Sequence, residues 1–167
     1  MILLLFFILA GWLCVHLLGG ISALAIVLQV TPLLRWQLAR GLDPNAEIKL
    51  LQQGPLPLIH WAAHENRPSI VQLLLEYGAT MDEWYEWVEA DDVRACQIFL
   101  SFGADPTPYG APVIHHCRSI EMYDSLVAAG ADSFLLGPES ETILHHGEQE
   151  PTCLRHLLEA GHDPNAG

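Results

Sequence analysis

The chain has 167 residues, 51% of them hydrophobic, and its 7 basic and 20 acidic side chains give a formal net charge of −13. This acidic balance excludes proteins that bind nucleic acid through many Lys and Arg contacts with phosphate groups. All charged side chains lie at or after Arg35, so the sequence divides into an uncharged apolar head and an acidic remainder the size of one ordinary domain.

The head, residues 1–30, predicts one membrane-spanning helix. Apolar residues run almost without interruption from Ile2 to Val30, and about 20 such residues are enough to cross the hydrocarbon core as a helix. The alternative is a signal peptide cleaved after Ala25, because Ala23-Leu24-Ala25 fits a small-x-small cleavage site. The absence of Lys or Arg before the apolar run favours the retained anchor.

The charges that follow the head predict its orientation. Arg35, Arg40 and Lys49 come soon after the apolar run, and no basic side chain precedes it. The positive-inside rule then places the domain, residues 31–165, in the cytoplasm behind a single membrane pass. Cleavage of the head would instead leave a secreted or periplasmic protein that inhibits or protects an enzyme there.

The remainder of the chain contains five glycine-centred segments that predict the ends of five helices. Apolar side chains stand three and seven residues before each glycine, and a polar one stands six residues before it, which is the pattern of one helix face. Glycine readily adopts the left-handed conformation that closes a helix. The glycines are Gly41, Gly78, Gly103, Gly130 and Gly161, and the apolar pairs are Leu34 and Leu38, Val71 and Leu75, Cys96 and Leu100, Tyr123 and Val127, and Leu154 and Leu158.

A second element recurs between the glycines, as Pro57-Leu58-Ile59-His60, Pro112-Val113-Ile114-His115 and Thr142-Ile143-Leu144-His145. With its helices and glycines, it resembles the ankyrin repeat, and residues 57–79 are the closest copy. The resemblance covers residues 31–165 and implies an all-α solenoid of about four to five irregular helix pairs behind the transmembrane helix. It also implies structural roles: His60, His115 and His145 would bond neighbouring loops, and Gly78, Gly103, Gly130 and Gly161 would close helices.

The sequence departs from this pattern in several places. The first unit has only its second helix, Thr31–Arg40, with Thr31 as cap, and Ser22–Val30 would be the missing partner of that helix. A long loop is expected over Asp43–Pro55. No T-P-L-H equivalent follows Gly78, and Thr80 to Glu83 reads as a capping box that opens a helix directly. The distances from His115 to Gly130 and from His145 to Gly161 predict shortened helix pairs.

Nine histidines and four cysteines raise the question of a metal site. His115-His116-Cys117 and His145-His146 are the strongest candidates, but adjacent side chains on a helix point in different directions. The cysteines at 96, 117 and 153 fall in apolar positions expected to be buried. The motifs of metalloproteases, nucleotide-binding loops and serine hydrolases are absent. We therefore predict no metal, cofactor, small-molecule substrate or catalytic residues.

The segment Asp82–Asp92 holds six acids, three large aromatic residues and no base. Trp84, Trp87 and Val88 would share a helix face and form core, while an exposed Tyr85 ringed by acids would receive a basic protein partner. The resemblance implies binding through the loops and the inner helices of the repeats. The candidate protein-binding residues are Trp61, Tyr85, Glu86, Glu89, His116 and His146, and the two histidines would charge between about pH 5 and 8.

Overall fold

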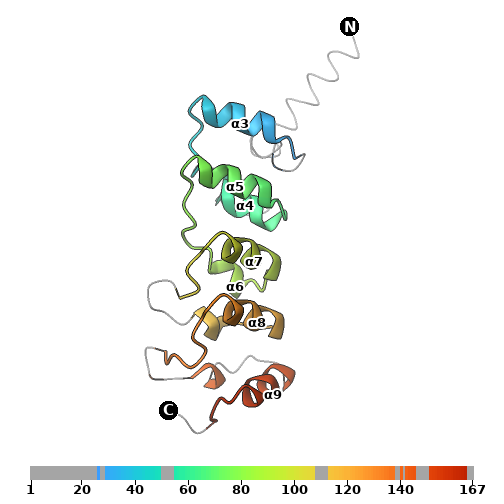
Figure 1. The fold of residues 1–167 in the computed structure, drawn as a ribbon, viewed down its shortest axis with the longest axis vertical. Helices are drawn as coiled ribbons and strands as arrows, with labels where there is room; N and C mark the ends of the chain where they lie inside the picture. Colours follow the sequence, from blue (N-terminus) through green and yellow to red (C-terminus); the bar gives the residue numbers. More distant parts are fainter. Residues whose placement is uncertain are drawn as a thin grey trace. The chain divides into compact units, whose positions relative to one another are not determined.

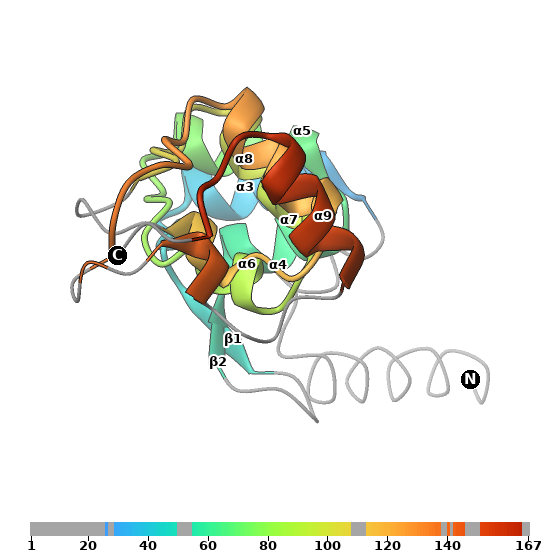
Figure 2. The same cartoon turned by 90° about the horizontal axis from the view of Figure 1, so that it is seen from below.

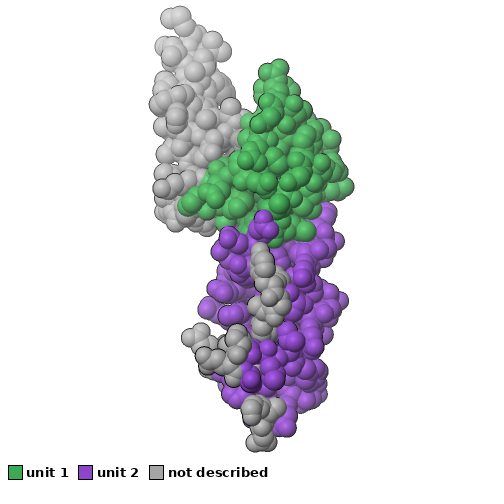
Figure 3. All heavy atoms as spheres, turned by 90° about the vertical axis from the view of Figure 1, so that its left-hand side faces the viewer, with its two compact units in different colours: residues 1–81 green, residues 82–167 purple. Residues whose placement is uncertain are grey.

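A computed structural model describes residues 26, 29–49, 55–107, 113–137, 140, 142–145 and 151–164. The chain forms two compact units, residues 1–81 and 82–167 (Figure 3). Most of the described residues lie in short helices (Figure 1). The predicted membrane helix falls on residues 1–30, of which only Ile26, Gln29 and Val30 are described, and no helix of the described part is long and apolar enough to cross a membrane.

Unit 1 contains three described helices and a β-hairpin. The helices are α3 (Thr31–Ala39), α4 (Leu58–His64) and α5 (Pro68–Glu76), and the strands are β1 (Glu47–Lys49) and β2 (Pro55–Pro57). Helices α4 and α5 form one pair, and α3 packs on α5. The core of the pair consists of apolar side chains on facing sides of the two helices, namely Leu58, Ile59, Ala62 and Ala63 of α4 and Ile70, Val71, Leu73 and Leu74 of α5.

The hairpin corrects the expectation of an all-α fold. Strands β1 and β2 are antiparallel, with Ile48 opposite Leu56 (Figure 2), in the segment where the sequence predicted only a loop. Ile48 is buried, and the exposed Glu47 precedes it, so a short alternating pattern favours a strand here. Prolines at both ends of β2 are tolerated because a two-stranded sheet has only edge strands.

The described residues of unit 2 form three helix pairs, in which the described first member is short. Their second helices are α7 (Val93–Ser101), α8 (Ile120–Ala128) and α9 (Pro151–Glu159), and the first members are α6 (Glu86–Glu89) and the 3₁₀ turns η2 (Val113–His116) and η3 (Ile143–His145). Helices α7 and α8 pack together, as do α8 and α9. The predicted shortening is confirmed for the pair of η2 and α8, whose first helix is a single 3₁₀ turn. In the last pair, residues 146–150 after η3 lie outside the described residues.

Two predicted helix starts are wrong. Thr31 is not a cap but the first residue of α3, and its N-cap is Val30. The capping box at Thr80 does not form either, because Glu83 adopts a left-handed φ of 57° that no helix interior accepts. The backbone N–H of Thr80 instead donates to Oδ1 of Asn45 at 2.9 Å, and α6 begins later, at Glu86.

The five glycine helix ends are confirmed. At Gly78, for example, φ is 91°, the glycine N–H donates to the carbonyl of Leu75 at 3.0 Å, and the N–H of Ala79 donates to that of Leu74 at 3.0 Å. This is the Schellman arrangement, which satisfies two carbonyls at the helix end. The same pair of bonds occurs at the other four glycines, whose φ values lie between 89° and 100°.

The predicted apolar face of the second helices is partly wrong. The polar position six residues before each glycine is exposed in all five helices, as expected. Three residues before the glycine, however, only Leu38 is buried, while Val127 and Leu158 are 40% and 42% exposed. Four residues before it, Leu74, Phe99, Leu126 and Leu157 are all buried. The buried face is therefore centred about one position nearer to the helix start than the sequence pattern indicated.

The chain just before α3 has the local structure of a first helix in a pair. Gln29 has a φ of 56° and donates its N–H to the carbonyl of Ile26 at 3.1 Å. Asn66 and Asp91, two residues before α5 and α7, have φ of 55° and make the same bond to Ala63 and Val88. Like Ala63 and Val88, Ile26 is completely buried. This agreement supports the predicted pairing of Ser22–Val30 with α3, although most of that segment lies outside the described residues.

Candidate interaction surface

In unit 2, helix α6 and turn η2 lie side by side and bring two of the predicted binding residues together. Oε1 of Glu89 lies 3.8 Å from Nδ1 of His116, and their side chains are 58% and 52% exposed. An exposed pair of this kind contributes at most about 1 kcal/mol to stability. Its placement on the surface therefore leaves both side chains accessible to a partner.

The aromatic residues around α6 divide between core and surface. Trp84 is only 3% exposed and Val88 is completely buried, so the predicted core face of this segment is confirmed for both. Trp87 is half-buried. Tyr85, the N-cap residue of α6, is also half-buried, rather than exposed as predicted, and the exposed Glu86 follows it.

The carboxylates of this segment have two kinds of role. Asp91 accepts a hydrogen bond from the hydroxyl of Ser119 at 2.7 Å, and Asp92 caps α7 by accepting from the N–H of Ala95 at 3.1 Å. The remaining four, Asp82, Glu83, Glu86 and Glu89, are exposed. With no Lys or Arg between Asp82 and Val93, these four side chains make the surface around Tyr85 strongly negative.

The other two candidate residues contribute less to this surface. Trp61 of α4, in unit 1, is only 8% exposed, and its buried indole N–H has no hydrogen-bond partner. Little of its side chain can therefore touch another protein. His146 lies outside the described residues. The described candidate surface thus consists of Tyr85, Glu86, Glu89 and His116, all in unit 2.

Two histidines of the recurring motif, His115 and His145, form different hydrogen bonds. Nε2 of His115 donates to the carbonyl oxygen of Leu135 at 3.0 Å, in the loop after α8, which is the kind of bond that the resemblance implied. Nδ1 of His145 instead accepts from the N–H of Thr142 at 3.1 Å, within its own motif. His60 and His115 are both 3% exposed, whereas His145 and His116 are exposed.

The three described cysteines are buried and not disulfide-bonded. Burial, with a smaller effect of Asp92 and Asp91, raises the pKa of the Cys96 thiol to about 12. Burial also raises the pKa of Cys117, and the thiol of Cys153 lies 3.4 Å from the carbonyl oxygen of Arg118. Cys96 and Cys117 therefore stay protonated near neutral pH, whereas metal ligation needs a thiolate. Within the described ranges, no three His, Cys, Asp or Glu side chains are arranged to hold a metal ion.

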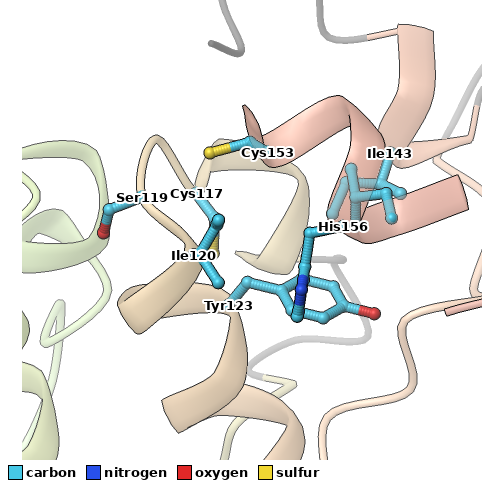
Figure 4. Close-up of a pocket in the computed structure, with 8 residues that line it drawn as sticks. Cys117, Ser119, Ile120, Tyr123, Ile143, Cys153 and His156 are labelled. Carbon is cyan, nitrogen blue, oxygen red and sulfur yellow. The ribbon is translucent and has the colours of Figure 1, made fainter. Parts of the chain in front are cut away.

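A small pocket lies between α8, η3 and α9 (Figure 4). Its interior volume is about 10 Å³, which is room for about one water molecule. The lining is mainly apolar or sulfur-bearing and includes Cys117, Ile120, Tyr123, Ile143 and Cys153. The pocket is too small for an organic ligand, so it represents imperfect packing between the last two repeats.

Several exposed apolar side chains were not predicted to be surface residues. Trp36 on α3 is 54% exposed, Val127 on α8 is 40% exposed, and Leu154 and Leu158 on α9 are each 42% exposed. The helical spacing had assigned Val127 and the two leucines to the apolar face. Because their spacing is the same as that of buried residues in other helices, it gave no signal of their exposure.

Comparisons with known proteins agree with this architecture. The family model of the ankyrin repeat matches residues 57–83, which run from the end of β2 through α4 and α5. Among solved structures, the ankyrin repeat domain of Bcl-3, described as a unique member of the IkappaB protein family, superposes with a TM-score of 0.63. The fold is that of an ankyrin-repeat domain.

The match to the Bcl-3 domain covers 90% of this chain and 74% of that chain at 18% sequence identity. At this identity, the ankyrin-repeat likeness establishes the fold and leaves the binding partner open. No curated protein matches the sequence. The function must therefore be argued from the surface of this ankyrin-repeat chain itself.

Proposed function

We propose that this chain is a membrane-anchored, non-catalytic protein-interaction module. The ankyrin-repeat fold is a typical non-catalytic interaction scaffold. The uncharged residues 1–30 supply an apolar segment long enough to span a bilayer. The burial of Ile26 close to the start of α3 is consistent with a short connection between this segment and the first repeat.

The binding surface in this proposal is the acidic patch, which consists of Tyr85, Glu86, Glu89 and His116. The observation that carries the proposal is the placement of Glu89 beside His116, 3.8 Å apart and both more than half exposed, next to a half-buried tyrosine. Aromatic side chains are frequent hot spots of interfaces, and complementary charge accelerates association. The partner is therefore a protein with a basic surface.

The partner surface is tested by co-purification from solubilised membranes at several salt concentrations. The double variant Glu86→Gln/Glu89→Gln is expected to lose most of the partner bound by the wild-type chain. The matched control, Glu47→Gln/Glu121→Gln, removes the same charge from exposed positions outside the patch and should retain the partner. Equal losses in both variants would mean that net charge, rather than this surface, holds the partner.

The anchor is tested separately by alkaline carbonate extraction and by the N-terminal sequence of the mature chain. A retained anchor predicts a chain that resists extraction and keeps residues 1–25. A protease-protection assay then tests the proposed cytoplasmic orientation. A mature chain that begins at Ile26 and is freely extracted would replace the anchored protein with the exported inhibitor or protector.

A further inference from the structure

The second helices of unit 2 contact one another through a repeated set of positions. Positions in these helices are numbered by counting back from the glycine that ends each helix. The side chain at position 6 of one helix forms a hydrogen bond with the side chain at position 5 of the next helix. Gln97 of α7 donates to the hydroxyl of Ser125 of α8 at 3.0 Å, and Asp124 of α8 lies 3.0 Å from Nε2 of His156 of α9. The ring of Tyr123, at position 7, also meets His156 edge-on, with centroids 5.6 Å apart.

Burial at position 7 depends on whether another helix follows. Leu34 of α3 and Cys96 of α7 are completely buried, and Tyr123 of α8 is 7% exposed. These helices pack on α5, α8 and α9 respectively. Leu154 occupies position 7 of α9, after which no helix is described, and it is 42% exposed. Leu154 thus lies at a position that the next described helix covers in α3, α7 and α8. With Arg155 and Leu158, whose positions are exposed in α8 as well, it forms a surface here called the trailing face.

The complementary side of α3 is also uncovered. Position 5 is buried in α5, where Leu73 is only 2% exposed, but in α3 it is Trp36, which is 54% exposed. Val30, 37% exposed, and the half-buried Leu33 precede Trp36 at helical spacing. These three residues are called the leading face. The guanidinium of Arg40 lies over the Trp36 ring at 4.4 Å.

We propose that the leading face of one copy of this chain docks on the trailing face of a second copy. In this contact, positions 6 and 7 of one helix would meet position 5 of the other, as they do between α8 and α9 in unit 2. Leu154 and Arg155 would meet Trp36 as Tyr123 and Asp124 meet His156, and arginine over a tryptophan ring is a favourable pair.

Charge favours a second copy over an unrelated helix. Residues 31–40 carry Arg35 and Arg40 and no acid, while Glu159 and Asp163 are exposed beside the trailing face. The two faces differ, so the contact is heterologous and builds chains or rings rather than a twofold dimer. This inference goes beyond the proposed binding function and does not depend on it.

The test is a mixing experiment with two full-length variants, each blocked at one face. Trp36→Glu removes the leading face and Leu154→Glu/Leu158→Glu removes the trailing face, in both cases at exposed side chains. Masses are measured by light scattering in detergent solution. Wild-type protein should show masses above the monomer that rise with concentration. Each variant alone should stay monomeric, and an equimolar mixture should form a dimer and nothing larger.

The control is Leu136→Glu, which removes another exposed apolar side chain, 50% exposed, outside both faces, and should assemble like the wild type. Circular dichroism checks that each variant is folded, and Trp36→Gln and Leu158→Gln are milder replacements for a variant that is not. A monomeric wild type at all concentrations overturns the proposal. So does a mixture that stays monomeric, or a single variant that still assembles.

Discussion

The hydroxyl of Tyr123 lies 3.2 Å from Nε2 of His162, and both side chains are almost completely buried. His162 follows Gly161 in the position that Ala79, Ala104 and Ala131 occupy after their glycines. Phe134 stacks on its ring with centroids 4.5 Å apart and an interplanar angle of 16°. The last repeat of unit 2 thus replaces a small apolar side chain with a titratable one held by a hydrogen bond and a stack.

This arrangement predicts a pH-dependent stability. Burial lowers the pKa of His162 below its ordinary value of 6.5, so the unfolded chain binds a proton more readily than the folded chain. Its contribution is therefore fully present above about pH 6.5 and is lost as the pH falls through the folded pKa. The ring of His162 contacts Tyr123 and Phe134, neither of which is charged near neutral pH.

The measurement is the free energy of unfolding by urea at pH 7.5, 6.5 and 5.5 for wild type and His162→Ala. The variant removes this titration, so its stability should decline less than that of wild type as the pH is lowered. Wild type and variant share all the other histidines, so the difference between their two declines in stability isolates the titration of His162. Parallel declines in the two proteins would show that His162 titrates normally.

Replacing Gly78 tests the backbone conformation at the helix ends. A methyl group there would meet no atom within 4 Å, so only the φ of 91° opposes a side chain. Gly78→Ala should destabilise the fold by about 1–2 kcal/mol, the cost of a left-handed alanine. Gly78→Asn should cost less, because Asn tolerates this conformation, as Asn66 does at φ 55°. Urea unfolding checks both, and equal losses would contradict the backbone explanation.

Ser119 links two helix starts in unit 2. Its hydroxyl accepts from the N–H of Met122 at 3.3 Å, which caps α8, and donates to Asp91 at 2.7 Å. Ser119→Ala should lower the free energy of unfolding by about 1–2 kcal/mol through loss of the cap. A double-mutant cycle with Asp91→Gly, which keeps the left-handed φ at that residue, should show coupling above about 0.5 kcal/mol. Additive losses would mean that the Asp91 bond contributes nothing.

The buried thiols predict slow chemical modification. In a Cys14→Ser variant, Cys96, Cys117 and Cys153 should react with a thiol reagent at pH 8 many times more slowly in the native protein than in urea. Both burial and the raised pKa of Cys96, about 12, limit the thiolate available. Rapid native labelling of any of the three would contradict their placement in the core.

Much of the fold could be predicted from the sequence because its local rules are strong. The left-handed conformation at each helix end strongly favours glycine. The polar position six residues before that glycine is exposed in every one of the five helices. The Asp91 carboxylate could not be separated from the surface acids, since its bond to Ser119 depends on how neighbouring helices pack. Asp92 instead bonds Ala95 at the start of its own helix, which is a local capping signal that was overlooked in the sequence.

Other features depend on tertiary neighbours that no sequence spacing reveals. Leu154 has the pattern of a core residue but is 42% exposed, and no helix is described after α9. Trp61 and Trp84 are buried, while Tyr85 is half-buried. Glu89 and His116 are 27 residues apart in the sequence. They form a pair only because α6 contacts η2, and that contact is visible only in the structure.

The most direct test of the central claim is photo-crosslinking in intact membranes from the acidic patch. The photoreactive residue p-benzoylphenylalanine is placed at Tyr85, and the matched control carries it at Tyr77, another tyrosine with a partly exposed ring, 37% exposed, on unit 1. The account predicts a protein adduct from position 85 that Glu86→Gln/Glu89→Gln abolishes, and none from position 77. No adduct at position 85, or equal adducts at both positions, would contradict a binding role for this surface.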